Sequence, residues 1–303
     1  MKILQRVVIV AILCYMGRLL YYQWTQIEEI DFSFSPWMML LSHISLTLLF
    51  IIDALGWHLI LRSLNHKPLT LDSIRIWMLS SLARYVPGGV WSYASRAEMA
   101  RRIDIGFAVS GVSLYLETLM LAMSSLVIGI PSWIFIDDQN IQLWHIALFC
   151  LLLGLGMHPN VLKLLRYLPG KIGIAFSKVE LPSIWYIFSI FLFYIVFWCL
   201  FGICFVFFVS LLCPVSKDLW LPIASSISLS FFVGFVIIFI PGGVGIRESV
   251  LYFILVPYIQ EISALLIAIS SRIWIMTGEF GAVCLIEFTY RLSRKLKLTW
   301  SRK

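Results

Sequence analysis

Two Pro-Gly-Gly motifs interrupt long apolar runs of this sequence, and basic residues flank both of them. The six residues of the motifs are Pro87, Gly88, Gly89, Pro241, Gly242 and Gly243. Proline cannot continue a helix and glycine lets the backbone turn, so each motif should break its helix and start a new one. Arg84 precedes the first motif and Arg247 follows the second, each by about one helical turn. Helix N-termini and arginines together favour an anion, such as the phosphate or carboxylate of a lipid headgroup.

Six further residues complete the candidate anion-binding set, because each follows a motif or lies within an apolar run. They are Trp91, Arg96, Glu117, Glu248, Arg272 and Glu279. A charge at the centre of a transmembrane helix costs about 2.5–3.5 kcal/mol on insertion scales, so each needs a partner or a cavity. We expect Glu117 and Glu279 to pair with Arg84, Arg247 or Arg272. The alternative is a purely structural ion pair between helices.

Arg96 and Asp53 receive less direct roles. Arg96 stands further along the segment that follows the first motif, so we expect it closer to the cytoplasmic headgroups. Asp53 lies within another apolar run and is expected to snorkel or to pair locally.

The sequence contains no recognisable catalytic or metal-binding constellation around these residues. Only Glu117, Glu248 and Glu279 could act as a nucleophile or base near the motifs, and no paired Asp and His accompany them. The six cysteines include no Cys-x-x-Cys pair, which argues against a disulfide framework or a zinc site. A Gly-x-x-x-x-Gly-Lys-Ser/Thr loop is also missing, which argues against direct drive by ATP. We therefore predict no cofactor and no metal.

The overall composition is that of an integral membrane protein. The chain has 303 residues, of which 61% are hydrophobic and 13% charged, and its mean hydropathy is +0.94. Soluble domains carry roughly 25% charged residues, so this chain has too few polar residues to cover a soluble core. The net charge of +7 includes no Lys/Arg-rich stripe in a polar setting, so no nucleic-acid partner is predicted. We expect one membrane domain over residues 1–303.

Six apolar runs are long enough to span a bilayer, which needs about 20 residues. They lie at about 3–22, 37–61, 106–136, 141–158, 184–212 and 263–288. No small-residue cleavage site follows the first run, so we expect a retained helix rather than a signal peptide. Two more apolar stretches, about 73–100 and 219–258, carry the Pro-Gly-Gly motifs in their middle.

Basic and acidic connections alternate along the chain and predict its orientation. The acidic connections are 23–36 and 137–140, and the basic ones are 62–75, 159–183 and the tail 291–303. The positive-inside rule puts the basic connections and both termini in the cytoplasm. All connections can lie on their predicted sides only if each motif-bearing stretch enters and leaves the membrane on the same side, as a re-entrant hairpin. A pair of full spans is the alternative, and the arm 219–240 could span alone.

The two motifs lie about half a chain length apart, and the two halves start on opposite sides of the membrane. This arrangement predicts an inverted-topology repeat with halves of about 1–140 and 141–290, followed by a basic cytoplasmic tail. In transporters of this design, broken helices form the substrate site near the bilayer midplane. The predicted fold is therefore all-α: a polytopic bundle of about six spans and two re-entrant hairpins, whose tips meet at an anion site.

Together these motifs resemble the lysylphosphatidylglycerol synthase transmembrane (flippase-like) family. The resemblance covers nearly the whole chain and rests on residues 84–91 with Arg96, residues 240–248, and the spans of Glu117 and Arg272. It implies a membrane domain that moves or binds lipids, and some members serve glycolipid or polyprenyl-phosphate pathways. Other members add a C-terminal domain that transfers an aminoacyl group from tRNA to phosphatidylglycerol. We expect that domain and its activity to be missing here, which favours a non-enzymatic role.

The sequence thus predicts a flippase- or scramblase-like translocase for an anionic or modified phospholipid or a lipid-linked intermediate. Its partners would be membrane lipids, and its location the cell membrane, the inner membrane of a bacterium. One alternative is a membrane-embedded enzyme or an accessory to a lipid-modifying enzyme or glycosyltransferase. Another is a partner subunit that transports nothing.

Overall fold

The described residues of this computed structural model form helices joined by short connections, and no strand occurs among them. The structure describes Arg18 and residues 35–85, 90–136, 143–167, 171–237 and 245–300. The all-helical fold class is therefore confirmed. Both Pro-Gly-Gly motifs, and the predicted span 3–22 apart from Arg18, lie outside the described residues.

Five helical segments of the described chain are long and apolar enough to cross a membrane. Four contain the predicted spans or most of them: α3 (Pro36–Ser63), α6 (Phe107–Ile136), α10 (Ile184–Ser210) and α13 (Glu261–Trp300). The fifth is α11 (Trp220–Val236) with the short helix η3 (Lys217–Leu219) before it. In hydrocarbon every backbone polar group must be satisfied within the segment, so even runs rich in β-branched and aromatic residues become helical.

One predicted span is shorter than expected. The run 141–158 contains α7 (Leu143–Met157), which has 15 residues, whereas a span needs about 20. The connection after it folds as three short helices, α8 (Pro159–Leu162), η2 (Lys163–Tyr167) and α9 (Lys171–Ser177).

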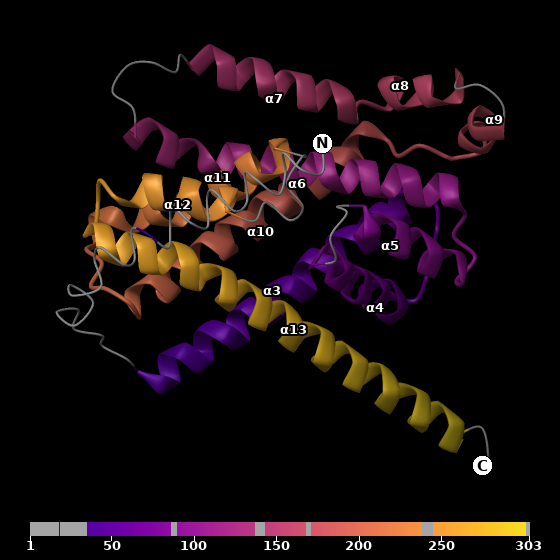
Figure 1. Cartoon of the computed structure of the whole chain (residues 1–303). Helices are drawn as coiled ribbons and strands as arrows, with labels where there is room; N and C mark the ends of the chain where they lie inside the picture. The colour runs from indigo at the N-terminus through magenta and orange to yellow at the C-terminus, as the bar shows by residue number, and fades with distance from the viewer. Residues whose placement is uncertain are drawn as a thin grey trace. The chain divides into compact units, whose positions relative to one another are not determined.

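Each Pro-Gly-Gly motif is flanked by two helices that pack against each other (Figure 1). The first motif follows α4 (Thr70–Ser81) and the 3-10 turn η1 (Leu82–Tyr85), and α5 (Trp91–Arg101) comes after it. The second motif lies between α11 and α12 (Ile246–Leu255). Among the described residues, one helical segment thus ends before each motif and another begins after it, at Trp91 and at Ile246.

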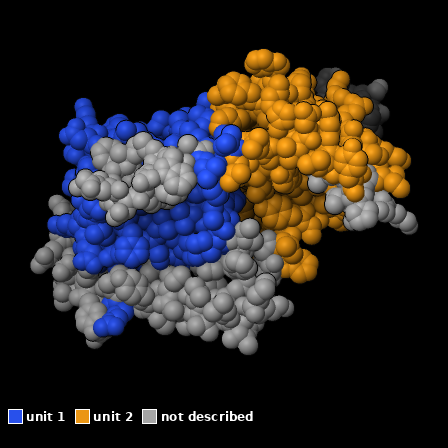
Figure 2. All heavy atoms as spheres, turned by 90° about the horizontal axis from the view of Figure 1, so that it is seen from above, with its two compact units in different colours: residues 1–46, 122–151, 195–276 blue, residues 47–121, 152–194, 277–303 orange. Residues whose placement is uncertain are grey.

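The contacts divide the chain into two compact units, which Figure 2 shows in different colours. Unit 1 consists of residues 1–46, 122–151 and 195–276, and it contains α11 and α12. Unit 2 consists of residues 47–121, 152–194 and 277–303, and it contains α4, η1 and α5. Each unit draws on both predicted repeat halves and carries one of the two motif-flanking helix pairs.

Aromatic rings and small residues pack the core of unit 1. The rings of Phe208 and Trp274 stack with centroids 4.7 Å apart, and Trp274 Nε1 donates a hydrogen bond to Ser42 Oγ at 2.9 Å. A Cβ at Gly202 would lie 2.6 Å from the carbonyl oxygen of Ala224. Glycine at this position therefore lets α10 and α11 approach closely, as small residues do between membrane helices.

The core of unit 2 is built in the same way. Trp57 on α3 is fully buried, and its Nε1 donates to Ser113 Oγ on α6 at 3.0 Å. Tyr194 on α10 is also fully buried and packs against Gly56 of α3. A Cβ at Gly56 would lie 2.6 Å from Tyr194 Cζ. Because glycine has no side chain, the tyrosine ring can pack directly against α3, the helix that carries Asp53.

Candidate functional site

Unit 2 encloses a network of five charged side chains, each from a different helix or turn. They are Asp53 on α3, Arg84 on η1, Arg96 on α5, Glu117 on α6 and Glu279 on α13. The exposed fraction is 7% or less for Asp53, Arg96, Glu117 and Glu279, and 33% for the side chain of Arg84. Burying charges is costly unless ion pairs and hydrogen bonds compensate them, so their partners decide what each residue can do.

Arg96 and Glu117 form a salt bridge enclosed by aromatic rings. Trp77 Nε1 donates to Glu117 Oε1 at 2.5 Å, and Arg96 Nε donates to Ser80 Oγ at 3.0 Å. The Arg96 guanidinium also lies 5.1 Å from the Trp77 ring centroid and 5.5 Å from that of Trp57. Glu117 therefore pairs with Arg96 rather than with any of the three predicted arginines, and the pair links α4, α5 and α6.

Arg84 and Glu279 form a second, less enclosed pair. Arg84 Nη2 lies 3.3 Å from Glu279 Oε1, and Tyr85 Oη donates to Glu279 Oε2 at 2.5 Å. Glu279 is fully buried, whereas about a third of the Arg84 side chain is exposed. The predicted pairing of Glu279 with Arg84 is thus present. Of the two arginines in the network, Arg84 is the more exposed.

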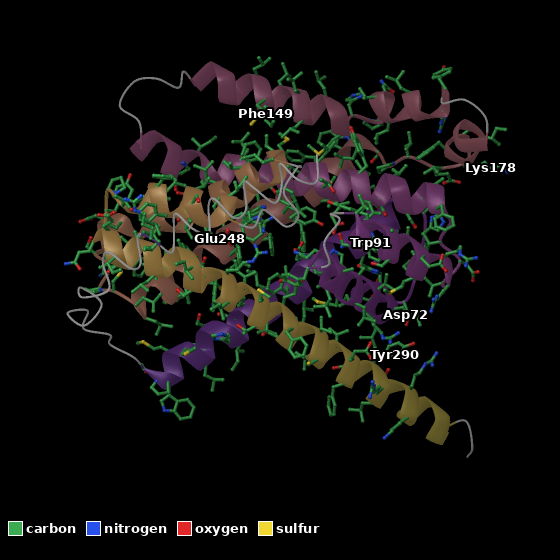
Figure 3. The ribbon with its side chains drawn as sticks, viewed as in Figure 1. Asp72, Trp91, Phe149, Lys178, Glu248 and Tyr290 are labelled. Carbon is green, nitrogen blue, oxygen red and sulfur yellow. The ribbon has the colours of Figure 1, made fainter. Side chains whose placement is uncertain are left out.

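The start of α5 lies beside Arg84. The turn η1 packs against α5, and Tyr93 in the first turn of α5 lies within electrostatic reach of the Arg84 guanidinium. The N-cap residue, Val90, makes no side-chain cap, and the first turn of α5 has no acidic residue. Trp91 begins the helix with 52% of its surface exposed (Figure 3). The first backbone N–H groups of α5 therefore add partial positive charge next to Arg84.

The corresponding helix start in unit 1 is already occupied by a carboxylate of the chain. Glu248, labelled in Figure 3, is buried on α12 and accepts a hydrogen bond from the Gly245 N–H at 2.7 Å. Its other oxygen lies 3.5 Å from Arg272 Nη1. Gly245 has φ of 84°, a left-handed conformation that glycine adopts without strain. Glu248 thus caps α12 and pairs with Arg272, which had been predicted to pair with Glu117 or Glu279.

Arg247 of unit 1 lies against the aromatic rings of α11. Its guanidinium carbon is 3.8 Å from the Phe231 ring centroid and 5.7 Å from that of Phe235. A Cβ at Gly234 would lie 2.7 Å from Arg247 Cγ, so the glycine between these rings makes room for the arginine. Cation–π contacts of this kind contribute about 0.5–2 kcal/mol each.

Sequence reasoning missed the polar aromatic residues of the site. Trp77 and Tyr85 donate hydrogen bonds to the two glutamates of the network, Glu117 and Glu279. The sequence signal was available, because a buried indole N–H or phenol O–H needs an acceptor. It also misjudged Asp53, which is buried in the protein. Asp53 Oδ1 has no hydrogen-bond partner in the part of the chain that the structure describes.

The described residues include no group of three or more His, Cys, Asp or Glu side chains placed to hold a metal ion. The six motif residues among the predicted site residues, Pro87, Gly88, Gly89, Pro241, Gly242 and Gly243, lie outside the described chain. Arg84, Arg96, Glu117 and Glu279 lie in one network, and Arg272 pairs with Glu248 in the other unit.

Comparison with known proteins does not identify this chain. No family model matches the chain, and no curated protein sequence matches it. The residues of the chain itself therefore carry the functional inference, above all the partly exposed side chain of Arg84 beside the start of α5.

Proposed function

We propose that this chain is a membrane lipid translocase of the flippase or scramblase type. It would bind the anionic headgroup of a phospholipid or lipid-linked intermediate at Arg84 and the start of α5. The observation that carries this proposal is the partly exposed Arg84 side chain beside an uncapped helix N-terminus. Guanidinium groups bind phosphate and carboxylate oxygens in a bidentate manner, and helix N-termini add partial positive charge.

Glu279 supports the proposal because it can exchange with a headgroup. Its contact with Arg84 measures 3.3 Å, longer than the roughly 2.7–2.9 Å of a strong charge-assisted hydrogen bond. Tyr85 donates to the other oxygen of Glu279, so the carboxylate keeps a partner when Arg84 turns to a ligand. A translocase needs such reversible binding, since the lipid must leave as readily as it enters.

Arg247 is the proposed counterpart in unit 1. It stands just after the second Pro-Gly-Gly motif and lies against the ring faces of Phe231 and Phe235. The resemblance of both motif regions to the lysylphosphatidylglycerol synthase transmembrane family agrees with a headgroup-binding role. Under this proposal each unit carries one headgroup-binding arginine.

The proposed topology has about six spans, two re-entrant hairpins in an inverted repeat, and both termini in the cytoplasm of a bacterium. Its support is the length of the helices that flank the motifs. The helices α4, α5 and α12 have 12, 11 and 10 residues, fewer than the roughly 20 that a span requires. The segment 217–236 is long enough to span by itself. For the second hairpin, the short helix α12 is therefore the only supporting length among the described residues.

The test measures the movement of headgroup-labelled anionic lipid in liposomes that contain the purified full chain. We expect movement faster than in protein-free vesicles, and a rate about tenfold lower in Arg84→Gln, since a hydrogen bond to a charged group contributes about 1.5–3 kcal/mol. Arg101→Gln is the matched control, because Arg101 is exposed and forms its salt bridge with Glu98 of the same helix. Equal movement with and without protein would end the proposal.

Lipid profiling of a deletion strain separates translocation from a role in lipid synthesis. A translocase predicts unchanged lipid composition with an altered distribution between the leaflets. A missing lipid species would instead favour the accessory or enzymatic alternative.

A further inference from the structure

The charged network of unit 2 contains one carboxyl more than it has guanidinium groups. Arg84 pairs with Glu279 and Arg96 pairs with Glu117, which leaves Asp53 as the third carboxyl. Asp53 has an exposed fraction of 7%, and its Oδ1 has no hydrogen-bond partner among the described residues. Its side chain is thus buried in a membrane-spanning helix without a counter-charge of its own.

The charged and titratable groups that face Asp53 come from five other elements of unit 2. They are Arg84 on η1, Arg96 on α5, Glu117 on α6, Tyr194 on α10 and Glu279 on α13. The two guanidinium groups are already compensated by the two glutamates, so an ionised Asp53 would leave one negative charge in excess. In a buried, water-poor setting a carboxyl avoids this cost by holding a proton.

Tyr194 packs against α3 close to Asp53. Tyr194 is fully buried and packs against Gly56, which lies three residues after Asp53 on α3. Because glycine has no side chain, the ring approaches the helix closely, and the phenol lies within electrostatic reach of the aspartate. The environment thereby favours the neutral acid over the carboxylate.

We propose that Asp53 is a proton-binding site and that its proton binds cooperatively with an anionic headgroup on Arg84. An anion on Arg84 offsets the positive charge that otherwise favours ionised Asp53, and it releases the negative charge of Glu279 from its partner. Both changes favour the protonated acid, so a bound anion makes Asp53 hold its proton more tightly. By linkage, the proton strengthens headgroup binding by the same factor.

The coupling to lipid movement rests on the proposed translocase function, whereas the proton site itself does not. If one proton accompanies one negative charge on the headgroup, the pair crosses without net charge. A pH gradient would then drive the lipid toward the alkaline side, and a membrane potential alone would not drive it.

The proton site is tested by infrared difference spectroscopy of the purified full chain between neutral and alkaline pH. We expect a C=O band of a protonated carboxyl that is lost at alkaline pH and absent from Asp53→Asn, which has the shape of the neutral acid. Asp104→Asn is the matched control, because Asp104 is an exposed aspartate of the same unit. Labelling all aspartates with carbon-13 should shift the band in the unmutated protein, so the test survives if Asp53→Asn does not fold. A band that is missing, or that ignores both changes, would overturn the site.

The coupling is tested in liposomes that contain the full chain, headgroup-labelled anionic lipid and an imposed pH gradient. One proton per negative charge predicts a leaflet ratio of about tenfold per pH unit, with the excess on the alkaline side. Asp53→Asn should still move lipid but distribute it evenly. Lipid movement in the wild type that ignores the gradient would overturn the coupling and leave the translocase proposal standing. An Asp53 infrared band without any lipid movement would overturn the translocase proposal together with the coupling, and would leave the proton site standing.

Discussion

Arg84 and Arg96 belong to one network, yet their surroundings give them different capacities. Arg96 is buried against Glu117 and two tryptophan rings, so it can hold helices together but cannot reach a lipid. Arg84 keeps a third of its side chain exposed and shares Glu279 with Tyr85. Exposure, rather than residue type, therefore separates the candidate ligand-binding arginine from the structural one.

A charge-balanced variant separates the ligand role of Arg84 from its structural role. Arg84→Gln alone leaves Glu279 buried without its arginine, and breaking a buried pair in this way costs about 3–5 kcal/mol. The double variant Arg84→Gln with Glu279→Gln removes both charges and should recover most of that stability in thermal unfolding. We expect the double variant to fold but to remain defective in liposome transport. Recovery of transport together with stability would show that the pair is structural only.

For the Arg96–Glu117 pair we expect a structural role. Glu117→Gln leaves Arg96 enclosed without a carboxylate, so we expect a loss of about 3–5 kcal/mol in the free energy of unfolding. Glu98→Gln is the control, since Glu98 forms an exposed pair with Arg101 and exposed pairs contribute little. Unfolding in denaturant measures both variants. Similar stability of the two would contradict a structural role for the buried pair.

At the scale of the elements, the two helices that follow the Pro-Gly-Gly motifs begin differently. The start of α5 has neither a side-chain cap nor an acidic residue, whereas Glu248 caps the start of α12 and also contacts Arg272. A carboxylate already in place competes with an incoming anion. The repeated motif therefore does not produce two equal binding sites, and the start of α5 is the better candidate.

The helix pair around the first motif predicts a measurable membrane topology. If the segment from α4 to α5 is re-entrant, its two ends lie on the same side of the membrane. Single cysteines in place of the exposed residues Lys67 and Asp104, in a cysteine-free background, should react with an impermeant reagent from one side only. Permeabilised vesicles provide the control for reactivity. Labelling of the two positions from opposite sides would show that the segment crosses the membrane.

At the scale of the whole molecule, the long apolar helices and the breaks between them could be predicted from the sequence. The helices α3, α6, α10 and α13 match apolar runs, because their composition allows little except a membrane helix. The ion-pair partners could not all be predicted. A buried glutamate must find a cation, but whether Glu117 meets Arg96 or another arginine depends on how each helix is rotated and packed.

The same reason explains the misjudged role of Asp53. Its position within an apolar run made a local partner plausible, since nothing in the sequence shows how many counter-charges a fold will bring near a residue. Only the packing of five elements around it reveals that both arginines of the network are already paired. Residue types thus indicate that a buried charge matters, and packing decides what it can do.

Trp77 lies close to both ion pairs of the charged network, Arg84–Glu279 and Arg96–Glu117. Its indole donates to Glu117, and its ring centroid lies 5.1 Å from the Arg96 guanidinium carbon and 5.8 Å from that of Arg84. The excited state of indole responds to the electric field around the ring. Any displacement of Arg84 by a headgroup changes that field, so the emission wavelength of Trp77 should report on the site in a variant whose other eleven tryptophans are replaced.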